Sequence, residues 1–461
     1  MPESHLLSLP RPNPVASPNG AIDTTTLAAH DFDVDNRTGF MPPQPPVSLL
    51  PSTWSAWEDV LADAQQKRLE LGESDEGTVW RESVRTMDVL PTRDLCQSEL
   101  FLRRAHHVLA WMLHFYVHTR DEAEKEIVIP RSLSVPLLRV CAQLQLPPVL
   151  TYSDNVLYNW EFDLSTPPDI PTPTTPLRCQ TLFTHTSTES IFYLVSARIE
   201  LIGVHALDLM RATMDELFVS DDIAVRRITE YLGALQPVIK RMKTELLAMK
   251  EKGCDPETFF NRVRPWLRGC EDAKWVFEGL DEAREEEDEE IWEPVELSGP
   301  SAGQSSLIHA LDIFLGVDKW SHSVVPLVQH HGAAPAQPAV PDPNPDTIAH
   351  TSSFLTRMQQ YMPRHHRHFL HHLATCSNLR EFVIARSSSH QLVDAYNGAI
   401  VALKEFRDAH LIIVALFIVG PAARARKAAV AEERKVLKGT GGTDIIQFLK
   451  TVRDQTRHAV L

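Results

Sequence analysis

One long stretch, Ala399 to Val419, constrains the fold of this chain more than any other part of the sequence. It contains no glycine or proline until Gly420-Pro421, so we expect a single helix that ends there. One face of this helix carries four apolar residues and one histidine: Leu403, Phe406, His410, Ile413 and Phe417. A stripe with this spacing packs against a protein core, so the stretch predicts a helical fold with a histidine at a buried surface.

A histidine in the middle of an apolar helix face needs a polar partner, because burying an unsatisfied polar group is costly. Two interpretations of His410 fit the residues. It is either a core histidine that is hydrogen-bonded to a carbonyl, or a metal or heme ligand whose ring projects from an apolar wall. The helix alone favours the first interpretation, and the rest of the chain has to decide.

Charge and cysteine usage exclude several classes of protein. The 461 residues carry a formal net charge of −16, which argues against binding to the phosphates of nucleic acids. The six cysteines are scattered without a CxxC pair, which disfavours a zinc ribbon or a disulfide framework and fits a reducing compartment. The N-terminus lacks a secretory pattern, and the longest apolar run, Leu411 to Val419, is shorter than the ~20 residues of a membrane span. We therefore expect a soluble, cytoplasmic protein.

Proline-rich segments indicate how the chain divides. Asp163 to Pro176, DLSTPPDIPTPTTP, can form neither a helix nor a central strand and marks a domain boundary. The pattern after this segment is helical throughout, so the predicted class is mainly α. The expected parts are a flexible leader (1–30), a small, mostly helical N-terminal domain (31–162), a linker (163–189) and a large helical domain (190–461) with mobile loops at 324–345 and 422–438.

Two further segments carry residues that can do chemistry. Ser298 to Gly316 joins a loop of small residues to an apolar helix, and such a loop either lets backbone approach a flat ligand or makes a tight turn. The helix from Ser98 to His118 carries four histidines at roughly helical spacing. We expect them to have no acidic or thiol companion and interpret them as core and rim residues: His106, His107, His114 and His118.

Seven segments, taken together and in order, resemble the indoleamine 2,3-dioxygenase family of heme enzymes. No single segment is decisive, but seven in the family's order are highly specific. They are LPPVLTYSDNVLYNW (146–160), FYLVS (192–196), FFNRVRPWLRG (259–269), SAGQSS (301–306), YMPRHHRHFL (361–370), FRDAHLIIV (406–414) and GTGGTD (439–444). The resemblance implies that the large helical domain binds heme b and that the small domain caps it.

The resemblance also implies how the heme would be held. It makes His410 the proximal ligand of the iron, which reverses the preference for a core histidine. Asp312 and Arg407 match the family's pair of residues that orient this imidazole and tune its basicity. On spacing alone, Arg407 would be placed at the surface.

A pocket for an indole and an amino-acid carboxylate is implied in the same way. Ser196, Phe259 and Arg264 are the expected catalytic group: Phe259 would stack on the indole, and Arg264 would bind the carboxylate through its planar guanidinium. The serine hydroxyl is a poor base, so we expect positioning to matter more than proton transfer. The other expected substrate-binding residues are Tyr152, Asn155, Val156, Phe192, Ser301, Ala302 and Thr440.

The implied reaction inserts both atoms of O2 across the indole C2–C3 bond of L-tryptophan and gives N-formylkynurenine, the first step of tryptophan breakdown towards NAD. O2 is then a co-substrate, an electron donor keeps the iron ferrous, and we expect a monomer with no nucleic-acid or membrane partner. Two alternatives stay open. One is a heme-binding relative that acts on another indole or responds to heme or a gas. The other is a helical scaffold that recruits partners through its proline segments and the acidic run Asp281 to Glu293.

Overall fold

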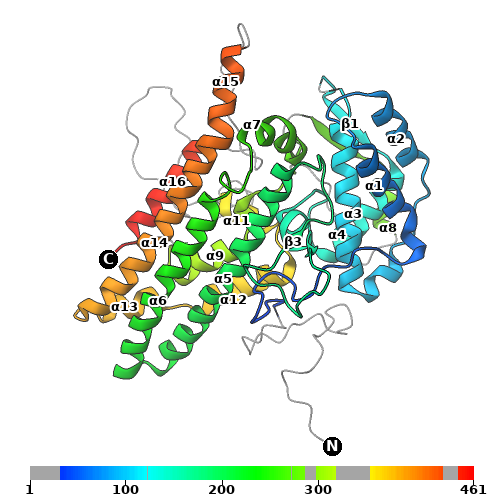
Figure 1. Cartoon of the computed structure of the whole chain (residues 1–461). Coiled ribbons are helices and arrows are strands. Elements are labelled where there is room, and N and C mark those ends of the chain that lie inside the picture. Colours follow the sequence, from blue (N-terminus) through cyan, green and yellow to red (C-terminus); the bar gives the residue numbers. More distant parts are fainter. Residues whose placement is uncertain (1–31, 122, 271–272, 286–296, 318–353, 429–444) are drawn as a thin grey trace, which may run out of the picture.

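The computed structural model describes residues 32–428 and 445–461, except for 122, 271–272, 286–296 and 318–353. The predicted mainly α class is confirmed, because helices dominate the described residues and their strands form two short two-stranded sheets. Figure 1 shows a compact group of helices from the N-terminal part of the chain beside a set of much longer helices from the rest.

The N-terminal group is built around α3 (Glu99–His118), which packs against α1 (Ser55–Lys67) and α4 (Arg131–Leu144). Apolar residues cover most of the circumference of α3, and nearly all its side chains from Leu102 to Val117 are buried. The helix α2 (Asp75–Thr86) contacts α1 and α4, and it begins at Ser74, whose hydroxyl accepts a hydrogen bond from the Gly77 N–H.

A short parallel sheet adds a later segment of the chain to this group. Strand β1 (Glu126–Ile129) pairs with β4 (Lys274–Phe277), and α8 (Leu280–Glu285) packs against α4. Strands β2 (Glu161–Phe162) and β3 (Leu177–Arg178) pair antiparallel and bring the two ends of the proline-rich segment together. This segment is a loop, as expected from its prolines.

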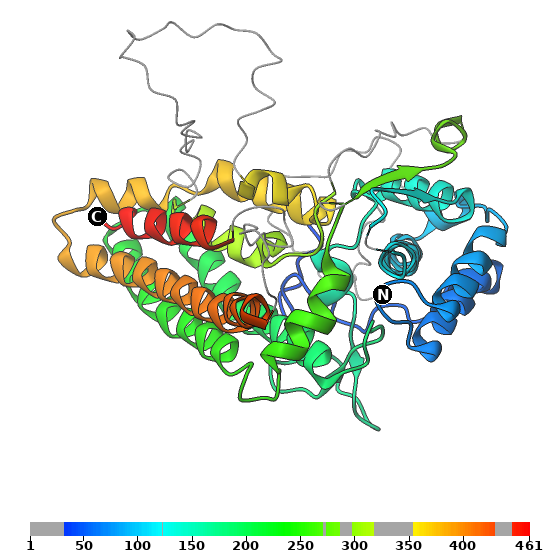
Figure 2. The same cartoon turned by 90° about the horizontal axis from the view of Figure 1, so that it is seen from above.

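The long helices form the second group. Helix α6 (Asp222–Leu247) packs against both α5 (Ser187–Val219) and α14 (His390–Val414), and α16 (Ile445–His458) packs on the other side of α14 (Figure 2). Side-chain caps fix the starts of two of them, since Thr186 accepts from the Glu189 N–H and Asp221 accepts from the Ala224 N–H.

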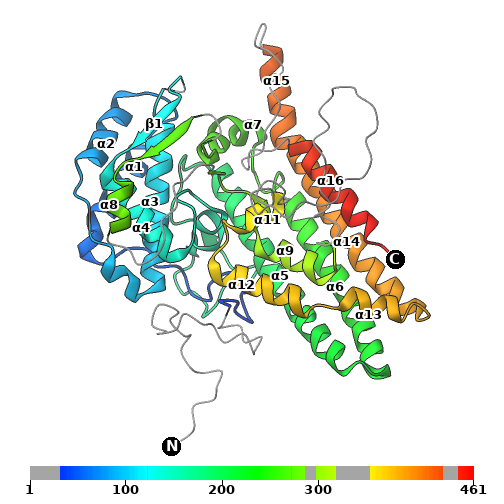
Figure 3. The same cartoon turned by 180° about the vertical axis from the view of Figure 1, so that it is seen from behind.

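Four shorter helices complete this group, and Figure 3 shows three of them, α9, α12 and α13, on one side of the long helices. They are α9 (Ser306–Phe314), α11 (Phe354–Gln359), α12 (Arg364–Cys376) and α13 (Leu379–Ala385). Apolar residues of α9, α12 and α13 join α5, α6 and α14 in one core, whereas Met358 of α11 joins the core of the N-terminal group. The core around α5, α6 and α14 supplies much of the lining of the candidate site.

The helix that was expected to end at Gly420-Pro421 continues past them, so that expectation was wrong. Helix α14 runs into a π-helical turn, η10 (Ala415–Val419), and α15 (Gly420–Ala428) follows directly. Pro421 lies in the first turn of α15, where its missing N–H costs no hydrogen bond within that helix. Residues 422–428 of the loop expected to be mobile are therefore helical, while 429–438, 324–345 and the leader 1–30 lie outside the described residues.

Two helical stretches of the described chain, Ser187–Val219 and His390–Ala425, are long and apolar enough to cross a membrane by length and composition alone. Half of the most apolar window of each is buried inside the protein. Core helices of a soluble protein have the same property, so this finding is weak evidence for a membrane span.

Candidate active site

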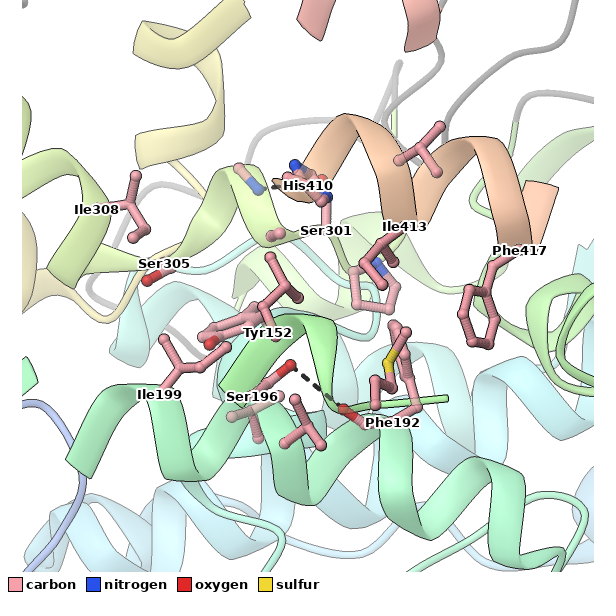
Figure 4. Close-up of a pocket in the computed structure, with 18 of the residues that line it drawn as sticks. Tyr152, Phe192, Ser196, Ile199, Ser301, Ser305, Ile308, His410, Ile413 and Phe417 are labelled. Atoms are coloured by element: carbon pink, nitrogen blue, oxygen red, sulfur yellow. Dashed lines mark hydrogen bonds between the residues drawn. The ribbon is translucent and has the colours of Figure 1, made fainter. Parts of the chain in front are cut away.

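A cavity of about 250 Å³ lies between α5, α9 and α14 and two irregular segments around Tyr152 and Phe259. Figure 4 shows His410, Ile413 and Phe417 of α14 and η10 on one side of it, with Phe192, Ser196 and Ile199 of α5 on the opposite side. The structure brings together every described residue that the family resemblance assigned to the heme and the substrate. These residues all line the cavity: Tyr152, Asn155, Val156, Phe192, Ser196, Phe259, Arg264, Ser301, Ala302, Asp312, Arg407 and His410. Thr440 lies outside the described residues. The role of each residue remains a prediction.

His410 differs from the four histidines of α3. Burial and, to a lesser extent, the nearby Arg407 charge together lower the pKa of its imidazole to about 4, so the ring is neutral near pH 7. Within the described chain it makes no hydrogen bond, whereas each of the four histidines of α3 makes at least one. A neutral imidazole with a free lone pair at a cavity wall has the form of a metal ligand rather than of a core histidine. His410 therefore has the chemistry of a residue that would bind a heme iron.

Arg407 and Asp312 form a buried ion pair behind His410. Arg407 Nη2 lies 2.6 Å from each carboxylate oxygen of Asp312, and a second guanidinium nitrogen donates to the hydroxyl of Thr456. This pair joins α14 to α9, and Thr456 adds α16. Neither partner is hydrogen-bonded to His410 in the described structure, so the pair acts on the imidazole through position and charge. Arg407 is 9% exposed, which contradicts the surface location that spacing suggested.

Three phenylalanines form an aromatic wall of the cavity. The ring centres of Phe192 and Phe259 are 4.7 Å apart, and those of Phe259 and Phe417 are 5.8 Å apart at nearly a right angle. Arg264 follows about one turn after Phe259 and is 8% exposed, with its guanidinium 5.8 Å from the ring centre of Phe260. Flat apolar surface beside a guanidinium is what recognition of an aromatic amino acid requires.

The backbone at the cavity contains three π-helical turns: η5 (Ser153–Leu157), η6 (Phe259–Val263) and η10 (Ala415–Val419). Each supplies cavity-lining side chains, among them Asn155, Phe259 and Phe417. Such turns are rare and are frequent at functional sites, because the extra residue redirects the side chains that follow. Sequence periodicity did not reveal them, since one added residue leaves an apolar helix pattern almost intact.

One wall of the cavity is built by a hydrogen-bond network that the sequence analysis missed. The hydroxyls of Tyr152 and Ser305 both donate to Glu200 Oε1, at 2.9 and 2.7 Å. Glu200 is 2% exposed, and burial raises the pKa of its carboxyl to about 7, although these two hydrogen bonds work against the rise. Gln304 accepts from the Tyr152 N–H at 2.8 Å and donates to the Gly299 carbonyl at 3.0 Å. Glu200 lies four residues after Ser196, so helix spacing alone could have placed it at the site.

Two glycines set the position of the small-residue loop. A Cβ on Gly299 would lie 2.0 Å from the Leu267 carbonyl oxygen, and one on Gly269 would lie 1.9 Å from that of Leu297. Only glycine allows the two backbones to come so close. The next residues line the cavity, and Ser301 caps the short helix η8 (Ala302–Gln304) by accepting from the Gly303 N–H at 3.2 Å. The close approach is thus between two protein segments, and the approach of this loop to a flat ligand stays a prediction.

The interpretation of the α3 histidines needs one correction. His106, His107 and His114 are buried as expected, but His106 does have an acidic companion, since its Nδ1 lies 2.8 Å from Asp154 Oδ1. Asp154 also accepts from the N–H and the hydroxyl of Thr151. This ion pair anchors the segment that carries Tyr152 and Asn155 to α3. No group of three or more His, Cys, Asp or Glu side chains in the described chain is arranged to hold a metal ion.

Comparison with known proteins assigns nearly the whole chain to one family. The family model described as indoleamine 2,3-dioxygenase matches residues 28–459. The chain belongs to the indoleamine 2,3-dioxygenase family. This is a family of heme-dependent dioxygenases, so the chain is an oxidoreductase of that type.

Individual relatives of this family match more than nine-tenths of the chain. It is 32% identical to indoleamine 2,3-dioxygenase of Saccharomyces cerevisiae, over 92% of both chains, and 30% identical to indoleamine 2,3-dioxygenase 1 of Rattus norvegicus, over 94% of this chain and 95% of the relative. It is 28% identical to a 6-hydroxytryptophan 2,3-dioxygenase of Fusarium equiseti, over 94% of this chain and 97% of the relative. The relatives thus include enzymes named for different indoles.

Proposed function

We propose that this protein uses heme b to insert both atoms of O2 across the indole C2–C3 bond of L-tryptophan, giving N-formylkynurenine. The observation that carries the proposal is the placement of His410. Its neutral imidazole, without a hydrogen bond in the described structure, faces a cavity that also holds an aromatic wall and Arg264. Family membership supports the same chemistry.

Several residues of this chain would hold the heme. His410 would bind the iron, and the Arg407–Asp312 pair would keep the helix that carries it fixed against α9. The loop Ser301–Gly303 would lie against the flat porphyrin, since its small side chains line the cavity. A bound ferrous heme supplies the binding and activation of O2, and the protein supplies position and electrostatics.

The protein's own part is to hold the substrate. Phe259 and Phe192 would clamp the indole, Arg264 would bind the carboxylate, and Thr440 would contact the amino-acid end. The inner end of the indole would meet Tyr152, Asn155 and Val156. Ser196 donates at 3.3 Å to the Phe192 carbonyl of its own helix, so its hydroxyl does not act as a strong base. Correct placement of the indole therefore has to supply most of the protein's contribution to the rate of the reaction.

The setting of the enzyme is part of the same proposal. We propose a soluble, cytoplasmic monomer that catalyses the first step of tryptophan breakdown towards NAD and receives electrons from a cellular reductant. The small domain (31–162), joined through the linker 163–189, would cap the heme domain (190–461). In support, Tyr152 and Asn155 of the first part and His410 of the last line one cavity.

A heme spectrum and a product assay of one matched pair of variants test the proposal. The wild-type protein should show a heme Soret band and form N-formylkynurenine from L-tryptophan with ascorbate and methylene blue. His410→Ala should lose both, while His368→Ala, an exposed histidine of α12, should keep both. A Soret band that survives in His410→Ala would refute the assigned ligand.

Heme without product from L-tryptophan would support the second candidate, a dioxygenase for another indole. The relative of Fusarium equiseti that is named for 6-hydroxytryptophan supports this candidate too. Wild-type protein without heme would refute both candidates.

A further inference from the structure

Every Ser-Pro or Thr-Pro dipeptide of the described chain lies in one loop, between β2 and β3. They are Thr166-Pro167, Thr172-Pro173 and Thr175-Pro176. Proline has no backbone N–H, so it suits a protein-kinase groove that offers no hydrogen-bond acceptor to the residue after the phosphorylated one. Proline-directed serine/threonine kinases select their substrates by this residue. The sequence offers them three similar threonines, and the structure distinguishes between these.

Thr166 lies in the most accessible part of the loop. Each of the seven residues 163–169 is exposed. The Thr166 hydroxyl makes no hydrogen bond in the described chain, and the backbone from Leu164 to Pro168 makes none there either. Another protein can therefore reach this hydroxyl without breaking a hydrogen bond of the residue that carries it.

Hydrogen bonds hold this exposed run at its two ends. The Asp163 N–H donates to the Pro176 carbonyl at 3.0 Å, beside the β2–β3 pair. At the other end, Gln44 Nε2 donates to the Asp169 carbonyl at 2.7 Å. The residues between these two points can change their conformation to fit the groove of a kinase while the strands at the base of the loop stay paired.

The other two threonines belong to a closed turn. The Thr172 N–H donates to Thr175 Oγ1 at 2.9 Å, the two hydroxyls are 2.8 Å apart, and the Thr175 N–H donates to the Thr172 carbonyl at 3.0 Å. Thr175 is also buried, with 8% of its surface exposed. This turn has to open before either hydroxyl can enter an active site, so the same dipeptide is protected here.

We propose that Thr166 is a phosphorylation site, modified by a proline-directed serine/threonine kinase with ATP as the phosphate donor. The Thr166 hydroxyl oxygen forms a bond to the γ-phosphorus of ATP, and the bond from that phosphorus to the β–γ bridging oxygen breaks. ADP leaves, and the hydroxyl proton passes to the catalytic aspartate of the kinase. The phosphate adds a charge of about −1.5 to −2 to the loop at pH 7. This modification is separate from the proposed dioxygenase reaction and does not depend on it.

The experiment incubates the full-length protein with Mg-ATP and two purified proline-directed kinases, one cyclin-dependent and one mitogen-activated, in separate reactions. Phosphopeptide mass spectrometry follows the rate at each threonine. We expect at least one of these kinases to modify Thr166, roughly tenfold or more faster than Thr172 or Thr175, because the hydrogen bonds of the turn oppose its opening. Thr166→Ala should remove this phosphate, and Thr166→Ser should keep it.

A matched variant tests the reason for the selectivity. Thr175→Val keeps the shape of the side chain but removes the oxygen that accepts from the Thr172 N–H. The rate at Thr172 should rise in this variant, and the rate at Thr166 should stay unchanged. An unchanged rate at Thr172 would overturn the protection assigned to the turn.

An acidophilic kinase, tested in parallel, separates two ways of recognising the same threonine. Such a kinase reads a carboxylate three residues after the acceptor, the position that Asp169 has relative to Thr166. Phosphate at Thr166 from this kinase alone would overturn the proposed kinase class. Equal rates at the three threonines, or no phosphate at Thr166 from any of the kinases, would overturn the site. A fall in the Tm of Thr166→Ala would do the same, because it would mean that the hydroxyl has a structural partner.

Discussion

Arg407 on α14 and Asp312 on α9 face each other with both carboxylate oxygens 2.6 Å from one guanidinium nitrogen. The two residues are nearly a hundred positions apart in the sequence, and the side chains are 10% and 4% exposed. Because the charges are buried, neither can be solvated if the other is removed. The pair therefore locks the helix that carries His410 against α9, which also lines the cavity.

Replacing Asp312 by alanine should be strongly destabilising. It leaves the Arg407 charge buried without its partner, so we expect the free energy of unfolding to fall by about 3–5 kcal/mol. Urea unfolding measures this change. Asp408→Ala is the matched control on α14, because Asp408 pairs with Lys404 at a site where both side chains are about one-third exposed, and its loss should cost under about 1 kcal/mol. Equal effects of the two variants would contradict a locking role.

Local patterns in the sequence predicted much of the fold. The predicted apolar face of α14 and η10 is confirmed, since Leu403, Phe406, Ile413 and Phe417 are all buried. Helix periodicity works here because it depends only on residues within a few turns of one another. The stop at Gly420-Pro421 was wrong for a related reason: a proline ends a helix in its interior but starts one equally well in its first turn.

Local sequence patterns could not predict contacts between segments that are distant in the chain. The companion of His106 is Asp154, 48 positions later, and the partner of Arg407 is on another helix, so no spacing rule connects them. The cavity residues were named through the family resemblance rather than through periodicity. Glu200 and Ser305 were overlooked although they lie within a few residues of named positions. Their role depends on the hydrogen bonds that the hydroxyls of Tyr152 and Ser305 donate to one carboxylate oxygen of Glu200, and only the folded chain brings these groups together.

The His106–Asp154 pair should make stability depend on pH. Burial acts to lower the pKa of His106, but the attraction of Asp154 outweighs burial and raises it well above the usual 6.5. Burial acts to raise the pKa of Asp154, but His106 brings it below 3.8. The contribution of His106 is fully present below pH 6.5 and is lost as pH rises through its raised pKa, and that of Asp154 is lost as pH falls through its lowered pKa.

The measurement is urea unfolding of the wild type and Asp154→Asn at several pH values. The variant should be most destabilised relative to the wild type between pH 3.8 and 6.5, and the difference should shrink as pH rises above this range. A difference that stays constant up to pH ~9 would mean that the pair is held by hydrogen bonding alone, without the charge on His106.

Glu200 should destabilise the folded protein above neutral pH. The unfolded chain releases this proton near pH 4.5, while the folded protein holds it to about pH 7, so the unfolded state binds fewer protons in between and stability falls as pH rises. The loss across this range is roughly 3 kcal/mol. Glu200→Gln stays neutral at every pH, so its stability relative to the wild type should rise by about that amount from pH 4.5 to pH 7. Parallel pH curves for the two proteins would show that Glu200 does not titrate in this range.

Arg264 should discriminate between substrates with and without a carboxylate. Its buried guanidinium lines the cavity beside Phe259, and a charge-assisted pair with a carboxylate contributes about 1.5–3 kcal/mol. We expect Arg264→Gln to lower kcat/KM for L-tryptophan by roughly 10- to 100-fold, with the heme content unchanged. Turnover of tryptamine, which lacks the carboxylate, should change little, because the aromatic wall remains.

Arg262→Gln is the control, since this neighbouring arginine is exposed and does not line the cavity. Equal losses for tryptophan and tryptamine would show that Arg264 shapes the cavity instead of binding the carboxylate.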